Sequence, residues 1–419
     1  MLDIRRLRED QRGIEKRLRT RDSAIDLAEI LELDRRRLGL IQEVEAIKAE
    51  RNRGSQEVGR LKKEKKDASS LIASLSTLGE KLASLDAELK ETAARVDALL
   101  ALLPNVPHPS VPVGPKEAKV VLRSHGEPPR ADFPVVHHLD LGEKKGILDF
   151  RRAAAIAGAR FPMYVGLGAR LEMALIQFMF AAHARNGFTP VLPPFLVNSE
   201  SFYVSSQLPK FADDIYHCEK DDLYLNPTAE TLLANLHRGE ILSLDELPRR
   251  YVAYTPCFRR EAGTYGEEER GLIRVHQFNK VEMFSFTTQE ESYAELDHLV
   301  ANAEGILQAL GLHYRVALLS SEDLAQQSAK TIDLEVFLPG QNRYYEVSSC
   351  SNCEDFQARR GNTRYRPSSG EKPLYVHTLN GSGVATSRLV ASILENNQLR
   401  DGRVRVPDVL QESVGAEFL

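Results

Sequence analysis

The sequence predicts an α+β protein in which an antiparallel sheet with flanking helices follows an N-terminal antiparallel helical coiled-coil arm. Two observations carry this prediction. Apolar residues recur at alternating spacings of three and four between residues 71 and 103, and beyond a proline-rich stretch short apolar strands are joined by long loops. Strands connected in this way, rather than by regular helices, favour an antiparallel sheet. A chain of 419 residues also exceeds what one core usually serves, so we expect several domains.

The arm is predicted from its heptad spacing. Nine of the ten seam positions between residues 71 and 103 are Leu or Val, with Thr92 as the exception. No proline precedes Pro104, so two long helices are permitted, and the polar stretch 65–70 could reverse the chain between them. A looser apolar seam upstream would face the first one; it consists of Leu31, Leu38, Ile41, Val44, Ile47, Val58 and Leu61. We therefore expect an antiparallel hairpin.

The expected tip of this hairpin carries a local positive charge. Residues 48–66 contain eight Lys or Arg and three Asp or Glu, although the whole chain has a net charge of −5. From the arm alone, a solvated helical face is the favoured interpretation. Clustered cations also bind polynucleotide phosphates. The candidate residues for such phosphate contacts at this tip are Arg51, Arg53, Arg60, Lys62, Lys63, Lys65 and Lys66.

Composition also suggests domain limits and a compartment. Four prolines in residues 104–112 indicate an extended linker, so we expect an arm over 1–103, a linker over 104–130 and a second domain over 131–419. Four cysteines are too few for a disulfide framework, which favours a reducing compartment. The N-terminus does not resemble a signal peptide, and no apolar run is long enough for a membrane span. We expect a cytoplasmic protein without a membrane partner.

In the second half of the chain, the segment 255–286 contains two apolar strands around a charged, glycine-containing loop. A hairpin would bring Arg259 and Arg274 over one concave surface, where planar guanidinium groups suit phosphate and carboxylate oxygens. Elsewhere we expect helices over 161–186 and 385–395, and strands over 189–197, 251–258, 275–286 and 344–348.

The segment 255–286 is similar to motif 2 of the class II aminoacyl-tRNA synthetases, and it most resembles the seryl members of bacterial or organellar type. Three further stretches agree with that family: Asn226–Glu230, the run that begins Glu346-Val347-Ser348-Ser349-Cys350, and Leu379–Ala385 followed by Arg388. The arm and the linker also belong to the family pattern. The resemblance thus covers nearly the whole chain.

This resemblance implies ATP-dependent activation of L-serine to seryl-adenylate and transfer to the 3′ end of tRNA(Ser), with tRNA(Sec) as a further acceptor. It also implies Mg²⁺, whose preference is for oxygen ligands and phosphates, and a homodimer with motif 1 near Gly187–Val197. The domain over 131–419 would be the catalytic one. The arm would grip the long variable arm of the tRNA by shape and backbone, which makes the basic residues of its tip the candidate tRNA-binding residues.

The family's functional residues carry over onto matching positions. The catalytic pair would be Arg259 and Arg388. Serine would contact Thr228, Ala229, Glu230, Arg259, Glu282, Asn380 and Ser382. ATP would contact Arg259, Arg260, Glu261, Arg274, Val275, Phe278, Glu346, Val347, Ser348, Ser349 and Arg388. The metal ligands would be Glu346 and Ser349.

Other interpretations remain open. Cys350 and Cys353 have the spacing of a zinc pair, but a structural zinc site needs four ligands and the other two cysteines are isolated. Departures from the family pattern are Arg260 in place of a small residue, Ser387 in place of glycine, and the acidic loop tip Glu267–Glu269. A catalytically silent paralogue with a binding or regulatory role, and an amino acid:carrier-protein ligase, are the two alternatives of other classes.

Overall fold

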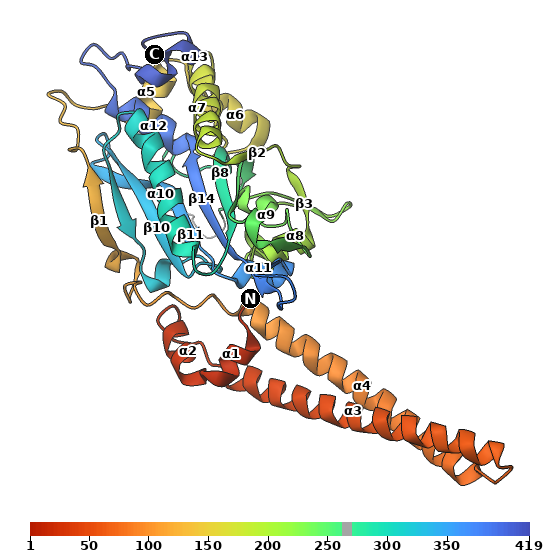
Figure 1. Cartoon of the computed structure of the whole chain (residues 1–419). Helices are drawn as coiled ribbons and strands as arrows, with labels where there is room; N and C mark the ends of the chain where they lie inside the picture. The colour runs from red at the N-terminus through yellow and green to blue at the C-terminus, as the bar shows by residue number, and fades with distance from the viewer. Residues whose placement is uncertain (262–269) are drawn as a thin grey trace. The chain divides into compact units, whose positions relative to one another are not determined.

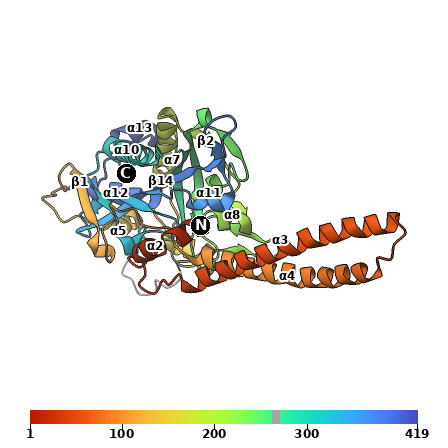
Figure 2. The same cartoon turned by 60° about the horizontal axis from the view of Figure 1, so that its bottom comes forward.

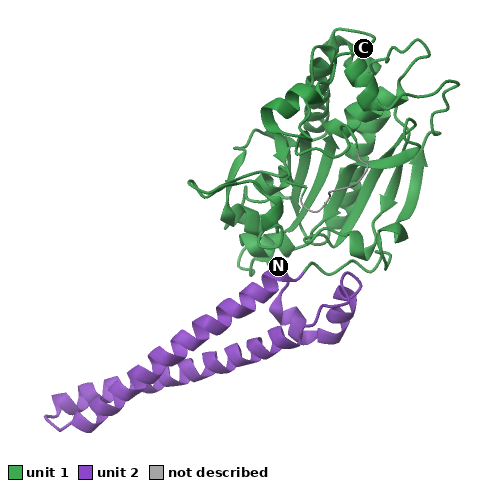
Figure 3. Ribbon diagram, turned by 180° about the vertical axis from the view of Figure 1, so that it is seen from behind, with its two compact units in different colours: residues 1, 104–419 green, residues 2–103 purple. Residues whose placement is uncertain are grey.

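The computed structural model describes residues 1–261 and 270–419 (Figure 1). The chain forms two compact units, which Figure 3 shows in different colours. One unit, the arm, is Leu2–Leu103, and the other, the body, is Pro104–Leu419 together with Met1. Among the described residues, no helix has the length and apolar character to cross a bilayer.

The arm is an antiparallel helical hairpin (Figure 2), as its heptad spacing predicts. Its helices are α1 (Ile4–Glu9), α2 (Gln11–Leu18), α3 (Ala28–Lys63) and α4 (Ser69–Leu102). The seam positions of α4 are all buried or half-buried. At the turn, Asp67 Oδ1 accepts a hydrogen bond of 2.9 Å from the backbone N–H of Ser69. Exposed ion pairs, such as Arg36–Glu88 at 2.6 Å, also join α3 to α4, although pairs of this kind contribute little stability.

The upstream seam is partly wrong at Leu38. Leu38 is 36% exposed, whereas Leu40 is fully buried and packs with Val44 and Ile47 against α4. Two residues along a helix turn about 200° around its axis, so Leu38 lies on the opposite side from Leu40. The buried face therefore runs through residue 40 rather than residue 38.

The body is built on an eight-stranded sheet in the order β1-β9-β10-β11-β14-β8-β7-β2. Neighbours are antiparallel except β2 and β7, which are parallel. The strands are β1 (Val120–His125), β2 (Thr189–Val191), β7 (Arg249–Phe258), β8 (Gln277–Thr287), β9 (Tyr314–Leu318), β10 (Lys330–Leu338), β11 (Arg343–Asn352) and β14 (His377–Ala385). Strand β1 lies inside residues 104–130, which we expected to be a linker, and the sequence did not predict a strand there.

Helices pack on this sheet to form the main core (Figure 1), for example Leu175 of α7, Leu299 of α10 and Ile393 of α12. The body helices are α5 (His138–Lys144), α6 (Phe150–Ala157), α7 (Leu167–Arg185), α8 (Ser199–Val204), α9 (Glu230–Leu233), α10 (Ser292–Ala309), α11 (Phe356–Gly361), α12 (Thr386–Asn396) and α13 (Asp408–Val414). Two small sheets complete the body: β3 (Leu196–Asn198), β4 (His217–Cys218) and β5 (Leu223–Leu225), and β6 (Ile241–Ser243), β12 (Arg364–Arg366) and β13 (Leu374–Tyr375).

Most expected elements of the body are confirmed, including the β7–β8 hairpin and helix α12. Two expectations were wrong in extent. The helix expected over 161–186 begins only at Leu167, because Pro162 and the positive φ of Gly166 (+54°) keep the preceding residues out of a helix. The strand expected over 189–197 is divided between two sheets, since Pro193 and Pro194 cannot donate to a ladder.

Candidate active site

Strand β8 supplies three site residues by simple alternation. Phe278, Lys280 and Glu282 lie on one face of the strand, and Val281 and Met283 face the core on the other. The β7–β8 register pairs Phe258 with Gln277 at the open end of the hairpin. The loop that follows β7 therefore leaves the sheet beside this polar face.

Strand β11 brings Glu346 and Ser349 to the same cavity by an irregularity. Residues three apart on a regular strand point to opposite faces. The register with β10 shifts here: Ser348 pairs with Leu334, but Glu346 pairs with the next residue, Glu335. Val347 is the extra residue of this bulge and has no partner on β10. Glu346 and Ser349 therefore face the same side of the sheet, and both line a cavity of about 620 Å³.

A second cavity, of about 190 Å³, adjoins the first, and Arg274, Glu346 and Arg388 line both. Its lining contains many of the residues predicted to bind ATP. The full set is Arg259, Glu261, Ile273, Arg274, Val275, Phe278, Lys280, Glu346, Ser382, Ala385, Ser387 and Arg388. The sequence prediction that a hairpin brings Arg259 and Arg274 over one concave surface is thus confirmed by the geometry.

The arginines of this smaller cavity have carboxylate or aromatic neighbours. Arg274 Nη1 donates to Glu261 Oε2 at 2.9 Å, and the Arg259 guanidinium lies 5.1 Å from the centre of the Phe278 ring. Arg388 Nη1 donates to Glu346 Oε2 at 3.2 Å. Burial alone would raise the pKa of Glu346, but the charges of Arg388 and Arg259 outweigh it and lower that pKa. The cavity therefore has fixed positive charge for an anionic ligand.

Beside this cavity, two buried carboxylates, Glu230 and Glu282, belong to a cluster of polar side chains. Asn380 Nδ2 lies 3.4 Å from Glu230 Oε2 and 3.3 Å from Glu282 Oε1. Lys280 Nζ is 2.5 Å from Glu282 Oε2 and donates to Thr228 Oγ1 at 2.7 Å. Burial and the charge of Glu282 raise the pKa of Glu230 to about 7.

The sequence did not predict three residues of this cluster, namely Lys280, Gln327 and Gln357. Lys280 could have been found, since it alternates on β8 with Phe278 and Glu282. Gln327 and Gln357 each donate to Glu230 Oε1, at 2.8 and 2.7 Å. These glutamines come from distant parts of the chain and carry no local pattern that would identify them.

Some predicted site residues lie apart from the cavities. Arg260 stacks over Tyr216, 5.6 Å from its ring centre, and does not line either cavity. Ala229 is fully buried where α9 begins, and Val347 lies in the core. Ser348 Oγ donates to the backbone carbonyl of Ser382 at 2.5 Å. The acidic tip Glu267–Glu269 lies outside the described residues.

The zinc interpretation of Cys350 and Cys353 gains no support. All four cysteines are free thiols, and burial raises the pKa of Cys353 well above its ordinary value. Within residues 1–261 and 270–419, the only group of three His, Cys, Asp or Glu side chains close enough to share an ion is His137, His138 and Glu395. That group contains no cysteine.

In the arm, the candidate tRNA-binding residues all have exposed side chains near the end of α3 and the following turn. Arg60 pairs with Glu57 at 2.6 Å, and Lys66 pairs with Glu64 at 2.8 Å. These acidic neighbours offset part of the positive charge at the tip.

Comparison with known proteins agrees with this architecture at two levels. Residues 214–397 match the family model of the tRNA synthetase class II core domain (G, H, P, S and T). A mainly antiparallel sheet with an arginine-lined cavity between the motif 2 hairpin and α12 is the core of a class II aminoacyl-tRNA synthetase.

The more specific matches extend over the whole chain. Residues 1–107 match the seryl-tRNA synthetase N-terminal domain. A serine–tRNA ligase of Thermodesulfovibrio yellowstonii is 50% identical and covers 100% of both chains. The crystal structure of seryl-tRNA synthetase from Pyrococcus horikoshii complexed with ATP has a TM-score of 0.95 at 38% identity, covering 100% of this chain and 99% of that one. A cytoplasmic serine–tRNA ligase from Naegleria fowleri, in complex with AMP, has a TM-score of 0.87 at 30% identity, with coverage of 100% and 98%. The chain belongs to the seryl-tRNA synthetase family.

Proposed function

We propose that this protein activates L-serine with ATP to give seryl-adenylate and transfers the seryl group to the 3′ end of tRNA(Ser). The observation that carries this proposal is the junction of two sites. A cluster with two buried carboxylates, Glu230 and Glu282, lies beside a cavity lined by Arg259, Arg274 and Arg388, and Lys280 belongs to both. The first suits the ammonium and hydroxyl of serine, and the second suits a triphosphate.

Arg259 lies at this junction. Its Nε donates to the backbone carbonyl of Pro227, next to Thr228 in the serine pocket, at 3.3 Å. Its guanidinium lies over Phe278, on which the adenine ring stacks in our proposal. Arg259 would thus hold both the serine carboxylate and the α-phosphate that this carboxylate attacks. Catalysis then comes from alignment and from neutralisation of the charge that develops as pyrophosphate leaves.

Recognition of serine rests on the two carboxylates having different partners. Gln327 and Gln357 both donate to Glu230 Oε1, which directs Oε2 toward the ligand as the ammonium acceptor. Glu282, paired with Lys280, would accept a hydrogen bond from the serine hydroxyl. Alanine would leave these buried groups without a partner, and such sites reject an analogue that lacks the hydroxyl by roughly 10⁴-fold.

Mg²⁺ would be held by Glu346 and Ser349, which are oxygen donors of the type that this ion prefers. A third acid supports a cation site here. Asp333 pairs with Ser349 across the β10–β11 ladder, and its Oδ1 is buried without a hydrogen bond. Burial and the charge of Glu346 raise the pKa of Asp333 well above its ordinary value. The ion would neutralise charge on the phosphates of ATP.

The remaining parts of the proposal concern the binding partners of the protein and its location in the cell. The arm over 1–103 binds tRNA(Ser) through its basic tip, and tRNA(Sec) would be a second acceptor. A homodimer is supported by exposed apolar side chains beside β2, in particular Leu192, which is 77% exposed, and Phe195. Four free thiols agree with a cytoplasmic location.

Charging of tRNA tests the proposal. Purified protein, ATP, Mg²⁺ and radiolabelled serine should give acid-precipitable seryl-tRNA with tRNA(Ser) transcript, and periodate oxidation of the 3′ ribose should abolish it. A protein that forms the adenylate but charges no tRNA would instead support the carrier-protein ligase. One that does neither would support the silent paralogue. The comparisons favour neither alternative.

A further inference from the structure

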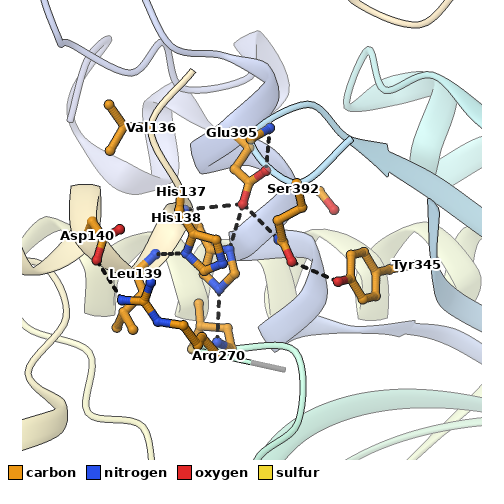
Figure 4. Close-up of polar contacts among 12 residues, drawn as sticks. Val136, His137, His138, Leu139, Asp140, Arg270, Tyr345, Ser392 and Glu395 are labelled. Carbon is orange, nitrogen blue, oxygen red and sulfur yellow. Dashed lines mark hydrogen bonds and ion pairs between the residues drawn. The ribbon is translucent and has the colours of Figure 1, made fainter. Parts of the chain in front are cut away.

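Outside the cavities, His137, His138 and Glu395 form a compact polar group where α5, α12 and the segment after the motif 2 loop meet (Figure 4). The atoms of this group are close enough to share a metal ion. Both ring nitrogens of His138 are already used, however: Nδ1 is 2.7 Å from Glu395 Oε1, and Nε2 is 3.0 Å from the backbone nitrogen of Leu272. An ion would have to displace one of these bonds.

The bonding fixes the proton on His138. The backbone N–H of Leu272 can only donate, so Nε2 must be the acceptor, and Nδ1 carries the hydrogen that is donated to Glu395. Both side chains are fully buried. A neutral histidine oriented by a buried carboxylate is a common means of holding a third group in place.

The group held by His138 is the segment that leads into Arg274. Gly271 has a φ of +71°, and a Cβ there would lie 2.4 Å from His138 Nε2. One residue later, Leu272 donates to that nitrogen, and Arg388 Nε donates to the backbone carbonyl of Ile273 at 3.2 Å. The backbone is therefore fixed on consecutive residues just before Arg274 enters the ATP cavity.

Glu395 extends the same network to β11, the strand that carries Glu346. Its Oε2 accepts from the backbone of Gly340 at 2.9 Å, and its Oε1 accepts from Gln341 Nε2 at 3.0 Å. These two residues form the turn between β10 and β11, and β11 carries Glu346. Gln341 also accepts from Tyr345 Oη at 2.7 Å. One carboxylate thus connects the turn before Glu346 to the segment before Arg274.

We propose that His138 and Glu395 are positioning residues for ATP, which act by holding Arg274 and Glu346 in register with each other. This inference rests on the proposed function, because it assigns a role in nucleotide binding. It predicts that loss of the His138–Leu272 bond weakens ATP binding and leaves serine binding unchanged, since the contacts of Glu230 and Glu282 do not involve this group.

Two substitutions at the same position separate this role from simple packing. In His138→Asn, the shorter amide can still donate to Glu395 but cannot reach Leu272. In His138→Gln, the longer side chain places an amide oxygen near the former Nε2, so it can accept from Leu272. In serine-dependent pyrophosphate exchange, we expect His138→Asn to raise KM for ATP about tenfold to a hundredfold, with KM for serine within about twofold. His138→Gln should stay within about threefold of the wild-type KM for both substrates, because it still accepts from Leu272 and so keeps the backbone before Arg274 in place.

Gly271→Ala should resemble His138→Asn, because its new methyl group pushes the segment away from His138. His237→Gln is a matched control: this partly buried histidine bonds to the carboxylate of Glu240 and to Tyr251 Oη, at the end of β7 away from Arg259. Thermal unfolding of each variant fixes a temperature at which all are folded. Equal rises in KM for ATP and serine, or equal behaviour of the Asn and Gln variants, would overturn the proposal. So would stoichiometric zinc in the purified protein.

If wild type shows no exchange, the proposed function fails rather than this inference. ATP affinity measured by calorimetry without any amino acid then still tests it. Weaker ATP binding by His138→Asn than by His138→Gln supports the positioning role, and equal affinity contradicts it.

Discussion

In the arm, the side chains proposed to bind tRNA come from the end of one helix and one turn. The cavity proposed to bind ATP instead takes its side chains from β8, β11, β14 and α12 and from the segments between β7 and β8. The arm residues are exposed, and the ion-pair partners of Arg60 and Lys66 are acidic side chains close by in the sequence. Those of the body are held by one another, as in the bonds of Arg274 to Glu261 and of Arg388 to Glu346.

This difference separates two kinds of recognition. The arm presents charge over a broad surface, so the loss of one cation should weaken binding in a graded way. The body presents a fixed geometry, so a small displacement should cost far more. Adenylate formation and tRNA charging should therefore respond to different substitutions.

The largest effect is expected at Arg259. We expect Arg259→Lys to lower kcat/KM for pyrophosphate exchange by about 10²–10³-fold, because an ammonium cannot bridge the serine carboxylate and the α-phosphate as a planar guanidinium does. Steady-state exchange kinetics measure this change. Arg403→Lys, at an exposed arginine paired with Asp401, is the matched control. Equal activity of Arg259→Lys and wild type would remove Arg259 from the site.

A smaller and more selective effect is expected at the tip of the arm. Replacing Lys62, Lys63, Lys65 and Lys66 with alanine should weaken charging of tRNA(Ser) by about tenfold to a hundredfold and make it less sensitive to salt, since fewer counterions are released. Pyrophosphate exchange should be unchanged. Lys81→Ala with Lys90→Ala, at exposed lysines elsewhere on α4, is the control. Equal loss of both activities, or of neither, would contradict a tRNA-binding tip.

The smallest effect is expected when the pH is changed. Because the pKa of Glu230 is raised to about 7, its carboxyl is increasingly protonated below neutral pH and loses its attraction for the serine ammonium. We expect kcat/KM for serine to fall about tenfold per pH unit below that value and to level off above it. Glu230→Gln should have low activity without this acidic limb. A profile that is flat from pH 6 to 8 in wild type would show that Glu230 is already ionised.

The same pKa has a consequence for stability, with a definite sign. The folded-state pKa lies above the ordinary value of 4.5, so the folded protein holds the proton more tightly than the unfolded chain. Glu230 therefore lowers the free energy of unfolding as pH rises from about 4.5 to about 7. Bound serine, which supplies an ammonium, should offset this loss.

The arm was predictable because a helix of 3.6 residues per turn that meets one partner leaves a periodic pattern of apolar residues. The error at Leu38 arose where that pattern is loose and two leucines, two residues apart, compete for the buried face. In the body, the motifs of the family identified the arginines and carboxylates. The placement of Glu346 and Ser349 on the same side of β11 depends on a β-bulge, which their spacing in the sequence does not predict.

The partners of those motif residues were not predictable in the same way. Gln327 and Gln357 reach Glu230 from 97 and 127 residues away in sequence, and Glu395 meets His138 across 257. A single glutamine or histidine in a sequence has many equally plausible roles, and only the folded arrangement selects one.

Serine-dependent exchange of pyrophosphate into ATP tests most directly the claim that the body alone selects serine and makes its adenylate. The wild-type protein should catalyse exchange with serine in the absence of tRNA, and alanine or glycine should support less than about one-thousandth of that rate. No exchange with serine, or comparable exchange with alanine, would contradict the assignment of Glu230 and Glu282 to a serine pocket.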